Sequence, residues 1–230
     1  THPFESSTAR LALEICRYTY AVGVGNSANA SDKEDSLAYI KSHSSPLGEP
    51  IPIVGGATSF ACIVPFEDRN VVSYMGTKTE FRAVKFSEFV DLLQSGNVLA
   101  IALKAKGFVR QFLQSLEDWG RNGEARAVSF HLDGSHIGKN QGVTLEGRVH
   151  EGFLKELRAV QEEVVAVLRQ LKHSDGSDRK VLVTGHSQGG AEAALATRAL
   201  AAAGFDVEVT YTFAAPRSGT QEFADSIKTP

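Results

Sequence analysis

The most regular hydrophobic pattern lies in the last third of the chain. Between Val149 and Lys172, apolar residues recur at spacings of three and four, as on one face of a long amphipathic helix: Phe153, Leu157, Val160, Val164, Leu168 and Leu171. A short apolar run from Lys180 to Thr184 predicts a strand, and an alanine-rich helix is expected after the next turn, to about Ala203. Asp206 to Phe213 predicts another strand, and Gln221 to Ile227 another helix. Strand, helix and strand with short joints predict a βαβ unit within a parallel sheet.

The first quarter of the chain has a weaker pattern. A helix is expected from Ser6 or Ser7 to about Tyr20. The polar stretch from Gly23 to Pro52 predicts mostly loop, with a short helix around Asp35 to Lys41. Two β-rich runs, Thr58 to Val64 and Asn70 to Met75, are separated by a segment whose composition suits a hairpin turn.

The middle of the chain is the least certain in pattern. Lys85 to Gln94 and Phe108 to Trp119 favour helices, while Val98 to Leu103 fits a strand or a helix equally well. Ala127 to Leu132 predicts a short strand, and Asp133 to Gly147 a polar, glycine-rich loop.

Length and composition are those of one globular α/β domain. The chain of 230 residues is 42% apolar, so we expect a single domain spanning residues 1–230. Its charged side chains are scattered and sum to −3, so a basic surface for nucleic acid or anionic lipid is not expected. The longest apolar run, Val98 to Leu103, is far shorter than the roughly 20 residues of a membrane span, which predicts a soluble protein. The sequence does not determine the compartment, and a secreted protein is one of the alternatives that it leaves open.

The cysteines and histidines point to no metal chemistry. Cys16 and Cys62 are the two cysteines, and two buried thiols are favoured over a disulfide framework. Neither the cysteines nor the histidines fall at ligand spacings, so we expect neither a metal nor a cofactor. A nucleotide-binding domain is disfavoured because no phosphate-binding glycine motif follows a predicted strand.

The segment Gly185-His186-Ser187-Gln188-Gly189-Gly190 carries the candidate chemistry. A serine hydroxyl is a poor nucleophile at neutral pH, so an enzyme must expose it and supply a base and oxyanion donors. This G-x-S-x-G pattern follows a predicted strand and precedes a predicted helix, where a sharp turn exposes the serine and glycines permit close backbone approach. We predict Ser187 as the nucleophile and the Gln188 amide, at the positive end of the helix, as an oxyanion donor. A glycine-rich turn that only joins strand to helix is the structural alternative, and His186 is expected to pack rather than act as the base.

Four segments resemble the class 3 (fungal-type) lipase family. Residues 181–191, Val-Leu-Val-Thr-Gly-His-Ser-Gln-Gly-Gly-Ala, resemble its nucleophile elbow, with Gln188 where leucine is usual. Residues 212–219, Thr-Phe-Ala-Ala-Pro-Arg-Ser-Gly, are similar to its T-F-G-A-P-R-V-G segment. Residues 149–153 and residues 71–77 match more weakly, and Met75 stands where the family usually has arginine.

The resemblance implies an α/β-hydrolase fold, with a central, mostly parallel sheet flanked by helices, and a carboxylic-ester hydrolase of the lipase, phospholipase or esterase type. Ser187 would accept the acyl group, and the oxyanion hole would consist of the Gln188 amide and Thr77. Without the resemblance, Thr77 would be interpreted only as the end of a strand. The substrate would be an ester or lipid. Residues 78–148 are a candidate lid or insertion region; an ordinary buried element is the alternative that we favour there.

The other two members of the catalytic triad are not found where the family has them. Its acid and histidine follow the serine in chain order, whereas all seven histidines precede Ser187 here. Asp206 and Asp225 do not occupy the family's usual acid position. We therefore expect the C-terminal part of the fold to be missing from this chain, with the triad Asp and His on a C-terminal segment or second chain. An upstream base, His150 or His136, is a less favoured alternative, and a catalytically inactive binding or interaction protein with this fold is another.

Overall fold

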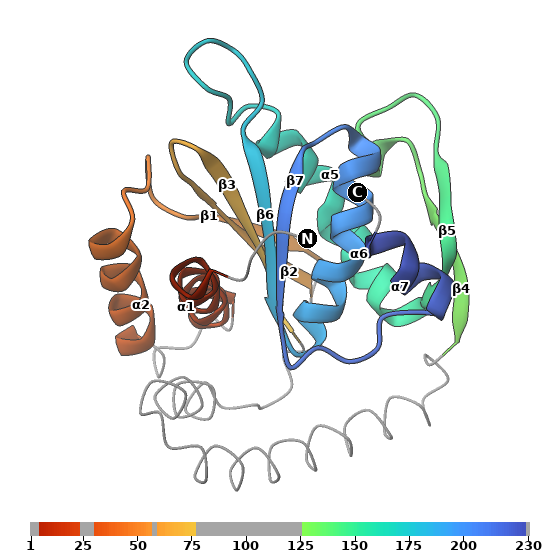
Figure 1. Cartoon of the computed structure of the whole chain (residues 1–230), viewed down its shortest axis with the longest axis horizontal. Coiled ribbons are helices and arrows are strands. Elements are labelled where there is room, and N and C mark those ends of the chain that lie inside the picture. Colours follow the sequence, from red (N-terminus) through yellow and green to blue (C-terminus); the bar gives the residue numbers. More distant parts are fainter. Residues whose placement is uncertain (1–4, 24–29, 57–58, 77–125, 229–230) are drawn as a thin grey trace, which may run out of the picture.

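The computed structural model describes residues 5–23, 30–56, 59–76 and 126–228 (Figure 1). In chain order the elements are α1 (Ser6–Gly23), α2 (Ala30–His43), β1 (Ile51–Gly55), β2 (Ser59–Pro65), β3 (Arg69–Tyr74), β4 (Ala127–Leu132), the 3₁₀ turn η2 (Ser135–Ile137), β5 (Val143–His150), α5 (Glu151–Leu168), β6 (Lys180–His186), α6 (Gln188–Ala203), β7 (Val207–Phe213) and α7 (Gln221–Lys228). One sheet has the strand order β1-β2-β3-β6-β7, and β4 pairs with β5 separately. The strand that leads into the predicted elbow, β6, therefore lies inside the larger sheet.

The larger sheet is mixed. β1, β2 and β3 pair antiparallel, whereas β3 with β6 and β6 with β7 pair parallel. Parallel neighbours need a crossover connection, and α6 provides it between β6 and β7. The predicted β2–β3 hairpin and the predicted βαβ unit are confirmed. Because β3, β6 and β7 run in the same direction, their carboxyl ends meet at one edge of the sheet.

Helices cover both faces of this sheet, which confirms the expected α/β class. Figure 1 shows α1 and α2 on one side of the strands and α5, α6 and α7 on the other. Neighbouring residues of a strand point to opposite faces. Thus Ile63 of β2 belongs to the core under α5 and α6, while Cys62 and Val64 belong to the core under α1. Every residue of β2 is buried, as expected for a strand covered on both faces.

Two predicted loops contain regular structure. Within the stretch from Gly23 to Pro52, α2 is longer than the expected short helix, and β1 begins at Ile51 because it pairs with β2. The predicted loop from Asp133 to Gly147 contains η2 and most of β5, which pairs antiparallel with β4. The helix predicted at Asp35 to Lys41 is confirmed, but it extends over more of the stretch than expected. The loop prediction for Asp133 to Gly147 was wrong because the pairing partner, not the local composition, decides whether a polar segment becomes a strand.

Part of the middle of the chain lies outside the described residues. This applies to the helices expected at Lys85–Gln94 and Phe108–Trp119 and to the run Val98–Leu103. Of the candidate lid or insertion region 78–148, residues 126–148 contain β4, η2 and most of β5. Helices in the described part of the chain are too short or too polar to cross a bilayer.

Cys16 and Cys62 are buried free thiols, as predicted. Burial raises the pKa of Cys16 to about 11, although hydrogen bonds with Thr184 and Ser73 act in the opposite direction. Burial likewise raises the pKa of Cys62 to about 12. Both cysteines therefore remain protonated at neutral pH and are poor nucleophiles.

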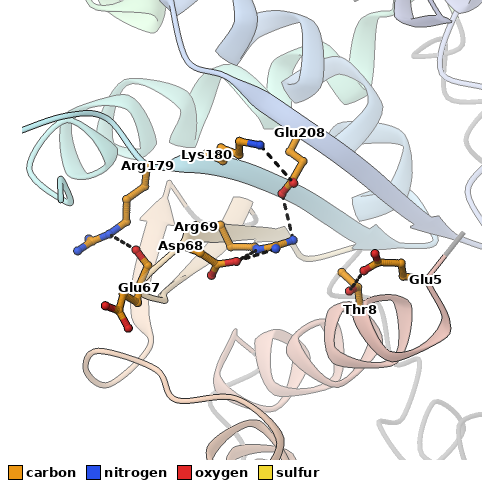
Figure 2. Close-up of polar contacts among 8 residues, drawn as sticks. All are labelled: Glu5, Thr8, Glu67, Asp68, Arg69, Arg179, Lys180 and Glu208. Carbon is orange, nitrogen blue, oxygen red and sulfur yellow. Dashed lines mark hydrogen bonds and ion pairs between the residues drawn. The ribbon is translucent and has the colours of Figure 1, made fainter. Parts of the chain in front are cut away.

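Ion pairs gather at the amino ends of the parallel strands (Figure 2). The Arg69 guanidinium donates to Asp68 at 2.8 Å through Nε and lies 3.0 Å from the Glu208 carboxylate. Lys180 Nζ lies 3.6 Å from the other oxygen of Glu208. We call Asp68, Arg69, Lys180 and Glu208 the charged end of the sheet; it lies opposite the edge where β6 runs into α6.

Candidate active site

Ser187 occupies a strained turn between β6 and α6. Its backbone has φ 56° and ψ −128°, which an L-residue adopts at a cost of about 1–3 kcal/mol. The Ser187 amide donates to the Phe213 carbonyl of β7 at 2.9 Å, and its carbonyl accepts from the Gly190 amide at 3.0 Å. Ser187 is half-buried, whereas the residues on either side of it are buried. The predicted strand–turn–helix setting of the nucleophile elbow is therefore present.

Backbone crowding explains the glycines of the motif. A Cβ on Gly185 would lie 2.1 Å from the Gly189 carbonyl oxygen. A Cβ on Gly189 would lie 2.1 Å from the carbonyl oxygen of Tyr74 at the end of β3. Real Cβ atoms do not approach backbone oxygen so closely, so α6 can pack against β3 and β6 at this turn only with glycine at both positions.

The amide of Gln188 is at the positive end of α6. Gln188 is the first residue of that helix, where backbone N–H groups lack acceptors within the helix and favour negative charge. The end of β3 lies beside it, since a Cβ on Gly76 would be 3.4 Å from the Gln188 nitrogen. The structure thus brings Ser187, Gln188 and Gly76 together. Thr77, the second expected oxyanion donor, lies outside the described residues.

Tyr20, at the C-terminal part of α1, joins these pieces and was missed by the sequence analysis. Its hydroxyl donates to the His186 carbonyl at 3.2 Å and accepts from the Gly76 amide at 3.1 Å. One phenol therefore fixes the residue before Ser187 to the end of β3. Burial raises the pKa of Tyr20, so the hydroxyl keeps its proton at neutral pH. The amphipathic spacing of α1 indicates only that Tyr20 lies in a helix, and no local signal identifies its distant partners.

His186 packs beside the elbow, as predicted. Its ring meets the Tyr20 ring edge to face, with centroids 5.8 Å apart, and its Nδ1 lies 3.4 Å from the Tyr20 hydroxyl. Burial lowers the pKa of His186 to about 3, so the ring is neutral at physiological pH. A neutral ring directed toward Tyr20 is suited to packing and is a weak base.

The upstream histidines considered as a base have other surroundings. His150 precedes α5 and stacks on Phe153, with ring centroids 4.3 Å apart. His136 lies in η2, where its Nδ1 accepts from the Asp133 amide at 3.1 Å. Within the described ranges, no histidine hydrogen-bonds to the Ser187 hydroxyl, and no three potential ligands cluster to hold a metal ion.

A second buried polar pair lies directly behind the elbow. The Gln188 side-chain amide donates to the Glu192 carboxyl at 2.8 Å, one turn further along α6. Gln188 is 7% exposed and Glu192 is 2% exposed. Burial raises the pKa of Glu192 well above the usual range; the Gln188 hydrogen bond lowers it in part and the charge of Glu156 raises it further. Burial therefore favours the protonated form of the Glu192 carboxyl.

Several solved lipase structures have a similar fold. A nonglycosylated lipase of Yarrowia lipolytica aligns over 99% of this chain with a TM-score of 0.58 and 17% identity, and a lipase of Rhizopus microsporus var. chinensis over 97% with 0.53 and 22%. A deletion mutant of the Rhizomucor miehei lipase propeptide complex aligns over 97% with a TM-score of 0.51 and 20% identity. The chain spans 66%, 61% and 55% of the lengths of these three proteins, respectively. Similarity at such low identity shows a shared fold.

The family described as Lipase (class 3) matches residues 80–230, which include the elbow, α6, β7 and α7. This match covers more than half of the chain and agrees with the strained serine between β6 and α6. The chain belongs to the class 3 lipase family.

Proposed function

We propose that this chain carries the nucleophile part of a serine carboxylic-ester hydrolase. Ser187 Oγ attacks the ester carbonyl carbon while a base takes its proton, and the oxyanion accepts hydrogen bonds from the Gln188 amide and from Thr77. Collapse of this intermediate breaks the carbon–oxygen bond to the alcohol, which leaves with the proton. Water then hydrolyses the acyl-enzyme and releases the acid. The observation that carries the proposal is the Ser187 backbone, at φ 56° and ψ −128°, on the turn where β6 joins α6.

The proposed oxyanion hole is supported by the packing of β3 against the elbow. Gly76 lies against the Gln188 nitrogen, and its own amide is held by the Tyr20 hydroxyl. The residue that follows Gly76 in the sequence is Thr77, which we propose as the second donor. We propose an ester of the lipid type as the substrate, in keeping with the family.

We further propose that the triad Asp and His belong to a polypeptide segment outside this chain, either C-terminal or on a second chain. This is supported by the neutral His186 ring and by the absence of a hydrogen bond from any described histidine to Ser187. It is supported also by β7, which is an edge strand of the described sheet and has no fully buried residue. An edge strand presents unpaired N–H and C=O groups on which a further strand can add.

The test is covalent labelling of Ser187 with a fluorophosphonate, together with native and denaturing mass spectrometry. We expect the complete wild-type protein, with the segment that carries the base, to be labelled and to hydrolyse a short p-nitrophenyl ester, and its Ser187→Ala variant to do neither. A second polypeptide that separates only on denaturation would carry the missing base. An unreactive Ser187 in the complete protein would contradict the proposal and favour an inactive binding protein. Activity of the 230 residues alone would contradict the external triad and favour an upstream histidine.

A further inference from the structure

Gln188 and Glu192 form a buried polar contact beside the apolar core. They are four residues apart on the first two turns of α6, the spacing at which helical side chains meet. Residues adjoining them on α6, among them Ala191, Ala193 and Leu195, belong to the core packed against α5. A buried carboxyl and a buried amide without partners would each be costly, so their hydrogen bond fixes both side chains.

The titratable groups that act on Glu192 come from three other elements. They are the Glu156 carboxyl of α5, the Tyr74 phenol of β3 and the Tyr20 phenol of α1. None of these is a cation, so none neutralises a Glu192 carboxylate. Burial raises the pKa of Tyr74 as well as that of Tyr20, and both remain neutral. The surroundings of Glu192 therefore favour its protonated form.

Ionisation of Glu192 would act on the same helix end as the reaction. The free amides of the first turn of α6 give this end a partial positive charge, which favours a developing oxyanion. A carboxylate one turn into the helix and shielded from water would oppose that effect. The ionised carboxyl would still accept from the Gln188 side chain, so ionisation acts through its charge, close to the Gln188 backbone amide that is the proposed oxyanion donor.

We propose that protonated Glu192 is a positioning residue for Ser187: it holds the Gln188 side chain and keeps the start of α6 free of negative charge. The inference rests on the proposed ester hydrolysis and deepens it. Glu192 does not touch the reacting atoms; it acts through Gln188. Deprotonation of Glu192 leaves this hydrogen bond in place but puts a negative charge at the start of α6, which slows acylation.

Two substitutions separate the hydrogen bond from the charge. Glu192→Gln keeps an oxygen acceptor for Gln188 and cannot ionise, whereas Glu192→Leu removes the acceptor at similar size. Thr197→Val is the matched control, because Thr197 lies on the same helix and hydrogen-bonds to Thr210 of β7 at 2.6 Å, away from the elbow. The measurement is the rate of fluorophosphonate labelling of Ser187 between about pH 6 and pH 10 in the full protein.

We expect Glu192→Gln to label at a rate within about twofold of wild type near neutral pH. In wild type we expect the labelling rate to fall as Glu192 ionises at higher pH, and in Glu192→Gln we expect no such fall. Glu192→Leu is expected to label about tenfold to a hundredfold more slowly, the scale of a misplaced catalytic group. Thr197→Val should label at the wild-type rate despite lower stability. Labelling of Glu192→Leu within twofold of wild type, or an unchanged alkaline decline in Glu192→Gln, overturns the proposal.

A second measurement keeps the inference testable if Ser187 does not react. Unfolded glutamate ionises near its ordinary pKa of 4.5, whereas folded Glu192 stays protonated to higher pH. Stability must therefore fall as pH rises above that value through the folded pKa, and Glu192→Gln must lack this fall. The melting-temperature difference between Glu192→Gln and wild type should widen with pH, and the Gln188 side-chain amide NMR signals should shift over the same range in wild type. If Ser187 does not react but the melting-temperature difference and the Gln188 signal shift are both present, the proposed function is contradicted and the inference about Glu192 is not. If the Gln188 signals do not change with pH, the inference is contradicted.

Discussion

The two ends of the parallel strands are held together by different interactions. At the carboxyl end, neutral groups dominate: the partly buried Tyr20 hydroxyl accepts from the Gly76 amide and donates to the His186 carbonyl. At the charged end, Arg69, Lys180 and Glu208 form ion pairs whose side chains are 19–54% exposed (Figure 2). Water screens these charges, so their geometry need not be exact.

The difference shows which end the fold must define accurately. A neutral hydrogen bond that is partly shielded from water depends on the close approach of its partners, because little water is available to replace a missing partner. The carboxyl end combines such bonds with backbone contacts that leave no room for a methyl group. We therefore expect substitutions at the carboxyl end to cost far more than substitutions at the charged end.

The largest effect is expected from Gly189→Ala. The added Cβ would lie 2.1 Å from the Tyr74 carbonyl oxygen, so α6 or β3 must move. We expect a loss of about 3 kcal/mol or more in the free energy of unfolding, and loss of Ser187 labelling in what still folds. Urea unfolding measures the first and fluorophosphonate labelling the second. The control is Gly48→Ala, where a Cβ meets nothing within 4 Å; equal losses for the two variants would refute the steric argument.

Tyr20→Phe should have an intermediate effect. Removing the hydroxyl takes away the acceptor of the Gly76 amide and the donor to the His186 carbonyl, while the ring remains. We expect a cost of about 1–3 kcal/mol, as for buried polar groups left without partners, and slower labelling of Ser187. Tyr39→Phe is the control, because its ring contacts with Arg10 and His43 survive the change. If both variants unfold at the same denaturant concentration as wild type, Tyr20 does not brace the elbow.

The smallest effect is expected from Glu208→Gln at the charged end. This change removes the charge that Arg69 and Lys180 share, at side chains that water reaches. A loss of less than about 1 kcal/mol is expected, and it should shrink when salt is added. Urea midpoints at low and high salt measure it, with the exposed Glu163→Gln on α5 as the charge-matched control. A salt-independent loss as large as that of Tyr20→Phe would mean that the two ends do not differ as described.

The sequence predicted the elbow well because its signals are local. An apolar run, a G-x-S-x-G turn and an alanine-rich helix follow one another within residues 180–203, and each predicts its own conformation. The structure has β6, Ser187 and α6 where this pattern indicates. The prediction of buried thiols at Cys16 and Cys62 held for a similar reason, since both lie on apolar faces.

The sequence failed where a distant partner determines the structure. β5 includes Glu146, Gly147 and Arg148, a composition typical of a loop. Yet a Cβ on Gly147 would lie 2.4 Å from the Phe223 nitrogen, so this glycine allows α7 to pack on the strand. Tyr20 is separated by 166 residues from His186. The Glu192 hydrogen bond is local, but the burial that keeps Glu192 protonated is produced by the packed core.

The long separation between Tyr20 and His186 also bears on the order of folding. β3 and β6 pair although they are distant in the sequence, and β7 supplies the carbonyl that holds the Ser187 amide. Contacts between distant segments carry a large loop-closure entropy and form slowly. The first turn of α6 binds the Ser187 carbonyl, but the Ser187 amide finds its acceptor, the Phe213 carbonyl, only after these segments have met. During synthesis, the strained turn at Ser187 therefore becomes complete only when β7 has joined the sheet.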